Sequence, residues 1–140
     1  MRSSQEGSWR RMEQTEQSGG EIVLVTIKRV YEKPVKGDGP RILVDGLWPR
    51  GFSCSELKIE AWMRELAPSA ALRKWYGHQP EKWDEFRRKY RRELAASPRM
   101  ELVKELVKRA RQGRIMLVFS ARNVERSNAA VLEKMVNARL

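Results

Sequence analysis

The chain has 140 residues, a length typical of one domain with a single hydrophobic core. Hydrophobic residues make up 41% and charged residues 34%, which argues against a disordered chain, and no apolar run approaches the roughly 20 residues that a membrane helix needs. One Cys and one His exclude an internal disulfide and leave no metal-ligand cluster, so we expect no metal and no other cofactor. The N-terminus has no apolar signal segment, so we expect a cytoplasmic protein without a membrane partner.

The N-terminal residues 1–20 are polar and lack periodicity, which indicates a disordered leader or a start codon placed too early, with Met12 as the alternative start. Residues 21–140 are then the folded domain. The β-branched run at 22–27 predicts a buried strand, and the Gly- and Pro-rich residues 31–40 predict a loop. A second short strand is expected at 41–45.

The middle of the chain alternates short elements. Ser53 and Glu56 have the spacing of a capping box, so a helical turn should start near Cys54. Residues 58–66 fit either a strand or a helix, and their alternation favours the strand. Ser69 should cap a short helix over 70–76, which Gly77 ends.

The C-terminal half predicts three helices and a strand. Pro80 suits the first turn of a helix over 80–96, and Ser97-Pro98 should begin another helix that Gly113 stops. The apolar run at 115–119 is typical of a central strand covered on both faces. Ser127 should cap a last helix over 128–139.

This order of elements predicts the fold class. Strands followed by helices, ending in a strand–loop–helix unit, are typical of a compact α/β domain with a small, mostly parallel sheet, here a three-layer Rossmann-like arrangement. In such sheets ligands bind beyond the carboxyl ends of the strands. Two loops leave strands in that way, one after Val44 and one after Phe119. If the two strands are parallel neighbours, both loops face one crevice.

The two loops hold an unusual mixture of residues. Asp45 ends a strand, Trp48 and Pro49 offer a rigid apolar wall, and Arg50 places a cation in a turn. In the second loop, polar side chains gather before a helix N-terminus, where free N–H groups attract anions. The alternative is ordinary loop pinning and helix capping. The candidate ligand-binding residues are Trp48, Arg50, Ser69, Trp75, Ser120, Arg122 and Asn128.

Two residues are candidates for catalysis. His78 is the only His, and its side chain normally titrates near neutrality, which suits a general acid or base. Asp45 is the accompanying carboxylate. A structural His in a turn is the alternative. Cys54 near a helix start is a weaker candidate nucleophile, because no partner for it is evident. The sequence leaves open whether any reaction occurs.

The stretches IKRVYE, RILVDGLWPRG, ELAPSAALRKWYGHQPEKWDEFRRKYRREL and FSARN, followed by NAAVL, resemble the DUF488 family, which includes the YeaO-like proteins. The resemblance runs in order from about residue 27 to residue 132 and implies a compact α/β domain, with no established activity. The matched motif residues are Asp45, Trp48, Pro49, Arg50, Gly51, Pro68, Ser69, Trp75, Trp83, Phe86, Tyr90, Ser120 and Asn128.

The chain departs from the pattern of the family at several positions. Gly46 stands where an Arg is common, Cys54 where a Lys is common, and Phe119 where a Tyr is common. Arg122-Asn123 replaces a common Lys-Asp pair. These departures weaken any transfer of catalytic roles, while Arg50, Ser69 and His78 remain available for binding.

The net charge of +11, from 29 Lys and Arg against 18 Asp and Glu, suggests an anionic partner, although a merely basic surface explains it equally well. The first functional hypothesis is a pocket for a small phosphate- or nucleotide-like ligand at the strand ends, with or without catalysis. The alternative is a nucleic-acid-binding module. A protein–protein adaptor has no specific feature in its favour. The nucleic-acid alternative rests on the Arg-rich helix 80–96 through Arg87, Arg88, Arg91 and Arg92.

Overall fold

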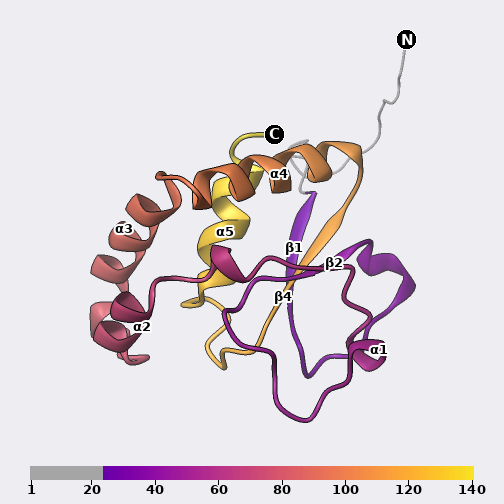
Figure 1. The fold of residues 1–140 in the computed structure, drawn as a ribbon, viewed down its shortest axis with the longest axis horizontal. Helices are drawn as coiled ribbons and strands as arrows, with labels where there is room; N and C mark the ends of the chain where they lie inside the picture. The colour runs from indigo at the N-terminus through magenta and orange to yellow at the C-terminus, as the bar shows by residue number, and fades with distance from the viewer. Residues whose placement is uncertain (1–23) are drawn as a thin grey trace.

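The computed structural model describes residues 24–140, so the expected leader over 1–20 and the start of the first expected strand lie outside the described residues. Within these described residues, four strands form one parallel sheet in the order β1-β4-β2-β3 (Figure 1). This confirms the predicted α/β class with a mostly parallel sheet. The strand at 115–119 pairs on both sides, as expected for a central strand. The strands are β1 (Val25–Arg29), β2 (Arg41–Leu43), β3 (Ala61–Trp62) and β4 (Ile115–Phe119).

The helices follow the predicted order with shifted ends. The predicted helix over 80–96 begins as a 3-10 turn at Pro80–Lys82 and becomes α-helical at Trp83. The last helix ends at Asn137, two residues earlier than expected. Two further 3-10 turns lie at Lys36–Asp38 and Arg64–Leu66. The α-helices are α1 (Cys54–Leu57), α2 (Ala70–Tyr76), α3 (Trp83–Leu94), α4 (Arg99–Gln112) and α5 (Asn128–Asn137).

The segment 58–66 forms much less strand than the alternation of its residues predicts. Only Ala61 and Trp62 pair, with Ile42 and Leu43 of β2. The chain then turns through a 3-10 helix, and this turn buries Leu66 completely. The segment therefore contains a short strand followed by a helical turn. Each of these two elements buries some of the apolar residues of 58–66.

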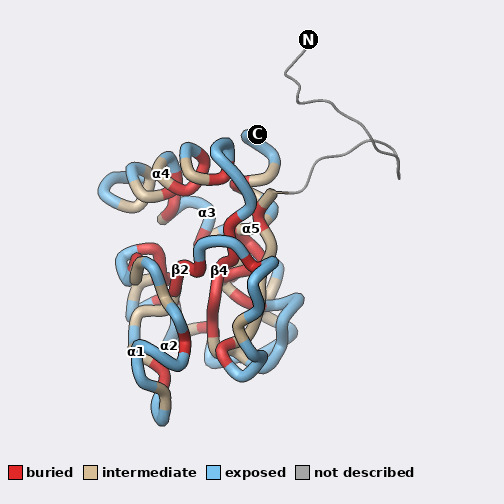
Figure 2. The backbone as a smooth tube through the Cα atoms, turned by 90° about the vertical axis from the view of Figure 1, so that its right-hand side faces the viewer, coloured by how far each residue is buried: buried red, intermediate tan, exposed pale blue. Residues whose placement is uncertain are grey.

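Alternate residues of the strands face two different layers. Residues 115, 117 and 119 of β4 pack with the apolar faces of α2, α3, α4 and α5 in the main core. Met116 and Val118 point to the opposite face and pack against Leu57 of α1. Figure 1 shows α2, α3, α4 and α5 together on one side of the strands and α1 with its loops on the other. The third layer is therefore made of a short helix and loops, and β4 is buried throughout (Figure 2).

The predicted caps are confirmed. Ser53 Oγ accepts the N–H of Glu56 at 3.1 Å, and Glu56 Oε1 accepts the N–H of Ser53 at 2.7 Å. Ser127 Oγ accepts the N–H of Ala130 at 3.1 Å at the start of α5. Gly77 ends α2 with a φ of 54°, a left-handed conformation that favours glycine. Within residues 24–140, every helix is too short or too polar to cross a membrane.

Candidate functional site

Asp45 lies where β2 ends, beside the end of β4. These two strands are parallel neighbours, as the two-loop prediction requires. The Oδ2 atom of Asp45 accepts the N–H of Ser120 at 2.9 Å and its hydroxyl at 2.8 Å. The loops after Val44 and Phe119 therefore meet at the carboxyl edge of the sheet, as expected when parallel strands are neighbours.

Asn128, the first residue of α5, joins the same group. Its side-chain Nδ2 donates to Val44 O at 3.2 Å and approaches Asp45 Oδ1 at 3.4 Å. The structure thus brings together three of the predicted site residues from three separate segments. Asp45, Ser120 and Asn128 are called the strand-end cluster below.

The carboxylate of the strand-end cluster is poorly hydrated. Burial raises the pKa of Asp45, while the hydrogen bonds from Ser120 and Asn128 and the charge of Arg73 lower it and offset only part of that effect. An aspartate with a raised pKa holds a proton more readily than a surface aspartate does. The hydrogen bonds of this side chain join the two loops, and its role in proton transfer stays a prediction.

Arg73 of α2 reaches the strand-end cluster from the helical layer. A Cβ atom built on Gly46 would lie 3.4 Å from Arg73 Nη1 and 3.4 Å from the Ala67 Cβ. The guanidinium therefore covers the backbone immediately after Asp45, and the absence of a side chain at Gly46 leaves it room. Arg73 remains exposed. Sequence reasoning missed it because an Arg on the polar face of a short amphipathic helix carries no distinguishing pattern.

The Trp-Pro-Arg loop is held closed by its own indole. Trp48 Nε1 donates to Phe52 O at 2.8 Å, which leaves Arg50 exposed between them. Trp48 packs edge-on against Trp62, with ring centroids 5.5 Å apart. Trp62 in turn donates to Asp45 O at 2.7 Å. The indole of Trp48 thus forms one wall of this loop. Trp62 contacts both Trp48 and Asp45, and the sequence did not identify it because residues 58–66 fitted either a strand or a helix.

Other predicted site residues have partners of their own. Ser69 donates its hydroxyl to Glu93 Oε2 at 2.5 Å while capping α2. Trp75 lies under the ammonium groups of Lys82 and Lys89, 4.9 and 4.2 Å from the ring. These contacts account structurally for both residues, and their roles in binding stay predictions.

His78 is exposed and has a φ of 57°, a conformation rare for residues with a side chain. Its ring lies 6.1 Å from that of Tyr76, and among residues 24–140 no hydrogen bond or ion pair joins it to Asp45. Arg122 is exposed in the loop after β4, and Cys54 is an exposed free thiol. A catalytic His78–Asp45 pair stays a prediction.

A buried tyrosine, Tyr90, lies close to Asp45 and Asn128 of the strand-end cluster. The Tyr90 hydroxyl of α3 donates to Leu66 O, and burial raises the pKa of this phenol far above its usual range. The side chain of Asn128 acts in the opposite direction and lowers the pKa of Tyr90, by less than burial raises it. The stripe of Trp83, Phe86 and Tyr90 belongs to the core, as its helical spacing suggested. Within the described residues, no group of three or more His, Cys, Asp or Glu side chains could hold a metal ion.

Comparisons with known proteins agree with the motifs. The model of a family described as "Inactive DUF488-N3 subclade" matches residues 24–140. Uncharacterized protein Rv3073c of Mycobacterium tuberculosis is 40% identical over 115 residues, which cover 82% of this chain and 95% of that protein. Uncharacterized protein YeaO of Escherichia coli is 37% identical over 108 residues, covering 77% and 92% respectively. No solved structure matches the chain. The chain therefore belongs to the DUF488 family.

Proposed function

We propose that the carboxyl edge of the sheet binds a small anionic ligand, phosphate- or nucleotide-like, through Arg73 and the strand-end cluster. The observation that carries the proposal is the exposed guanidinium of Arg73 next to Gly46, the residue that directly follows Asp45, whose carboxylate binds the Ser120 hydroxyl and the Asn128 carboxamide. A planar guanidinium matches a phosphate or carboxylate two bonds at a time. Arg50 and Arg122, both exposed in the two loops, add positive charge at the rim.

The departure at position 46 fits this proposal. The family resemblance implies an Arg where this chain has Gly46, and here the guanidinium of Arg73 lies 3.4 Å from the Cβ position of that residue. We infer that Arg73 supplies from α2 the cation that an Arg at 46 would supply from the loop.

A nucleotide-like ligand has a surface to stack on. Tyr31, just after β1, is 60% exposed and contacts Phe52 edge-on at 5.6 Å. The Arg29 guanidinium covers one side of its ring at 4.6 Å and donates through Nε to Ala121 O at 2.9 Å. Tyr31 is thereby tied to the loop after β4, so a base could stack on the aromatic ring while its phosphate meets an arginine.

Binding is favoured over turnover. The description of the matched subclade includes the word "inactive". Both oxygens of Asp45 are engaged by groups of the protein itself, and its partners are a serine hydroxyl, a main-chain N–H and a carboxamide. This arrangement positions loops and lacks the nucleophile–base–orienter chain that covalent catalysis uses. We therefore propose a binding module, with enzymatic turnover as the alternative that an activity would reveal.

The experiment is a tryptophan-fluorescence titration with inorganic phosphate, ribose 5-phosphate and AMP, with Trp62 as the reporter beside Asp45. Wild-type protein should show a saturable change for at least one ligand. Arg73→Gln should weaken that Kd by at least roughly tenfold, because a hydrogen bond to a charged group contributes about 1.5–3 kcal/mol. Arg88→Gln, which removes an exposed cation from α3, is the matched control and should leave the Kd unchanged. No saturable response, or equal losses in the two variants, would contradict the proposal.

The nucleic-acid alternative on α3 receives less support from the geometry. Arg87 lies 3.4 Å from Asp84, and Lys89 lies 3.1 Å from Glu85 on the same helix. Such pairs are typical of a solvated helix face. Arg88, Arg91 and Arg92 are exposed, and this role for them stays a prediction.

A further inference from the structure

A groove with only cationic charge lies along α4, away from the strand-end cluster. Its volume is about 490 Å³, and within the described residues its lining contains no carboxylate. Four of the six lining side chains are cations, and the others are a nearly buried Val107 and an amide. The lining residues are Lys104, Val107, Lys108, Arg111, Gln112 and Arg139.

The cations form a row with a facing partner. Lys104, Lys108 and Arg111 follow the i, i+4, i+7 spacing of one helix face, so they extend over about 10 Å at 1.5 Å per residue. Arg111 Nη2 donates to Arg139 O at 2.8 Å, which holds the turn after α5 against α4. All four cations are exposed.

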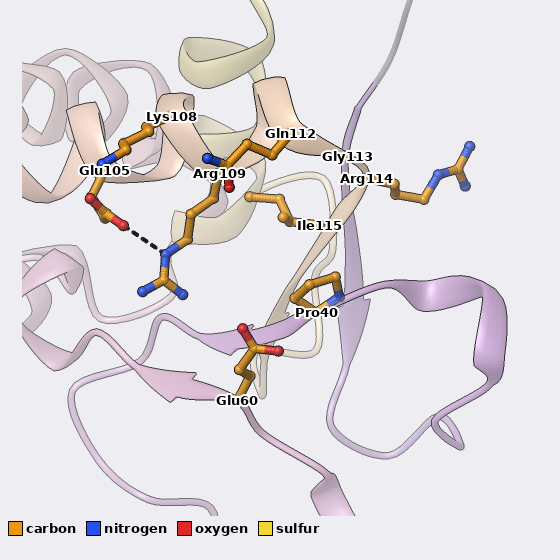
Figure 3. Close-up of a pocket in the computed structure, with 9 residues that line it drawn as sticks. All are labelled: Pro40, Glu60, Glu105, Lys108, Arg109, Gln112, Gly113, Arg114 and Ile115. Atoms are coloured by element: carbon orange, nitrogen blue, oxygen red, sulfur yellow. Dashed lines mark hydrogen bonds and ion pairs between the residues drawn. The ribbon is translucent and has the colours of Figure 1, made fainter.

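A neighbouring cavity of about 420 Å³ shares Lys108 and Gln112 with the groove but has a different character (Figure 3). It contains Glu60 and Glu105, and Glu105 already binds Arg109 at 2.9 Å. Figure 3 shows these acids and Arg109 turned toward one another, with Arg114 pointing away. An anion is therefore favoured in the groove and not in this mixed cavity.

Helix-end electrostatics do not account for the row. Cations near a helix C-terminus stabilise its free carbonyls, but this effect falls off within the last turn. Lys104 lies two turns before the end of α4 at Gln112, and Arg139 belongs to the segment after another helix. The row of cations therefore extends further than stabilisation of the C-terminal end of α4 requires.

We propose that this groove binds the phosphate backbone of a single-stranded nucleic acid. The successive rises between the three α4 cations are about 6 and 4.5 Å, which suits neighbouring phosphates of a flexible strand better than one compact phosphate group. The groove is open and lined by exposed cations, and the chain carries a net charge of +11. Its lining includes Gln112 at the end of α4, three residues before β4 begins at Ile115, and the strand-end cluster lies where β4 ends. The two sites are therefore separate.

The test measures binding of a short labelled single-stranded RNA by fluorescence anisotropy at about 50 and about 200 mM salt. The full-length chain carries Lys104→Gln, Lys108→Gln and Arg111→Gln together. Each lost phosphate contact lowers the salt slope by about 0.7, so the triple variant should lose a slope of about 2 and bind at least roughly tenfold more weakly at the lower salt.

The matched control removes the same charge from α3 through Arg88→Gln, Arg91→Gln and Arg92→Gln, and it should reduce the affinity far less. Because Arg111 also holds the C-terminal turn, the double variant Lys104→Gln, Lys108→Gln tests the groove with that contact intact. Equal losses in the two triple variants would overturn the proposal in favour of bulk charge. The proposal would also be overturned if the protein showed no salt-dependent RNA binding. Binding of anionic vesicles without binding of RNA would overturn it as well. The groove triple variant should leave the fluorescence response of the strand-end cluster to AMP unchanged, which separates this proposal from the ligand site.

Discussion

Asp45 is the residue on which the geometry of the candidate site depends. Its carboxylate joins the end of β2 to the loop after β4 and to the first residue of α5. Burial raises its pKa above the ordinary value of an aspartate. A carboxylate whose folded-state pKa is raised contributes stability below its unfolded-state pKa, and this contribution is lost as the pH rises through the folded-state pKa. Holding the charge at neutral pH therefore costs the fold stability.

Asp45→Asn should remove this dependence. The amide keeps the shape of the side chain and an oxygen acceptor for Ser120, but it does not ionise between pH 4 and 7. We expect the free energy of unfolding of wild type, relative to the variant, to fall as the pH rises above about 4. Urea unfolding of both proteins at several pH values measures the difference. A difference that stays constant, or grows with pH, would mean that the pKa of Asp45 is not raised.

At the scale of elements, the start of α2 is fixed by a residue of α3. Ser69 Oγ accepts the N–H of Leu72 at 3.2 Å, and both the hydroxyl and the N–H of Ser69 bind Glu93. This double attachment sets the position of α2, and with it the position of Arg73 one turn later. The candidate site therefore depends on a contact between helices that no local sequence pattern shows.

Ser69→Ala should lower the free energy of unfolding by about 1–2 kcal/mol, because it removes a helix cap and leaves Glu93 with one partner fewer. Ser53→Ala, at the exposed cap of the four-residue helix α1, is the control and should cost less than about 1 kcal/mol. Urea denaturation compares the two. Equal costs would show that the bond to Glu93 adds nothing beyond capping.

For the whole molecule, stability in acid should depend on a carboxylate far from the strand-end cluster. Asp38 is almost fully buried between Arg41, 2.8 Å away, and Lys28, 2.9 Å away. Burial alone would raise the pKa of Asp38, but hydrogen bonds from Lys28, the Val35 N–H and Arg41 together lower it. A lowered folded-state pKa contributes stability above the unfolded-state pKa, which is lost as the pH falls through the folded-state pKa.

Asp38→Asn should be strongly destabilising at neutral pH, by roughly 3 kcal/mol, because it leaves buried cations without their carboxylate. Its loss relative to wild type should shrink in acid, where wild-type Asp38 takes up a proton. Asp84→Asn, which removes the exposed partner of Arg87, should cost less than about 1 kcal/mol. Thermal unfolding followed by circular dichroism at neutral and acid pH measures both. Similar losses in the two variants would contradict a structural role for the buried group.

The sequence predicted the frame of this molecule better than the contacts within it. Strand 115–119, the caps at Ser53, Ser69 and Ser127, and the meeting of the loops after Val44 and Phe119 followed from local pattern and from the behaviour of parallel sheets. The short length of β3 could not be predicted in this way, because an edge strand and a turn can bury the same alternating residues. The position of Arg73 beside Gly46 could not be predicted either, since the packing of α2 decides which polar residue contacts the loop.

The most direct measurement is a titration of isotope-labelled protein with AMP, followed through its backbone amide NMR spectrum. We expect saturable shifts concentrated at Gly46, Ser120 and Asn128, with the amides of α4 unmoved. Arg73→Gln should weaken these shifts at the same ligand concentration. Shifts confined to α3 or α4, or none at the strand-end cluster, would contradict a ligand site at the carboxyl edge of the sheet.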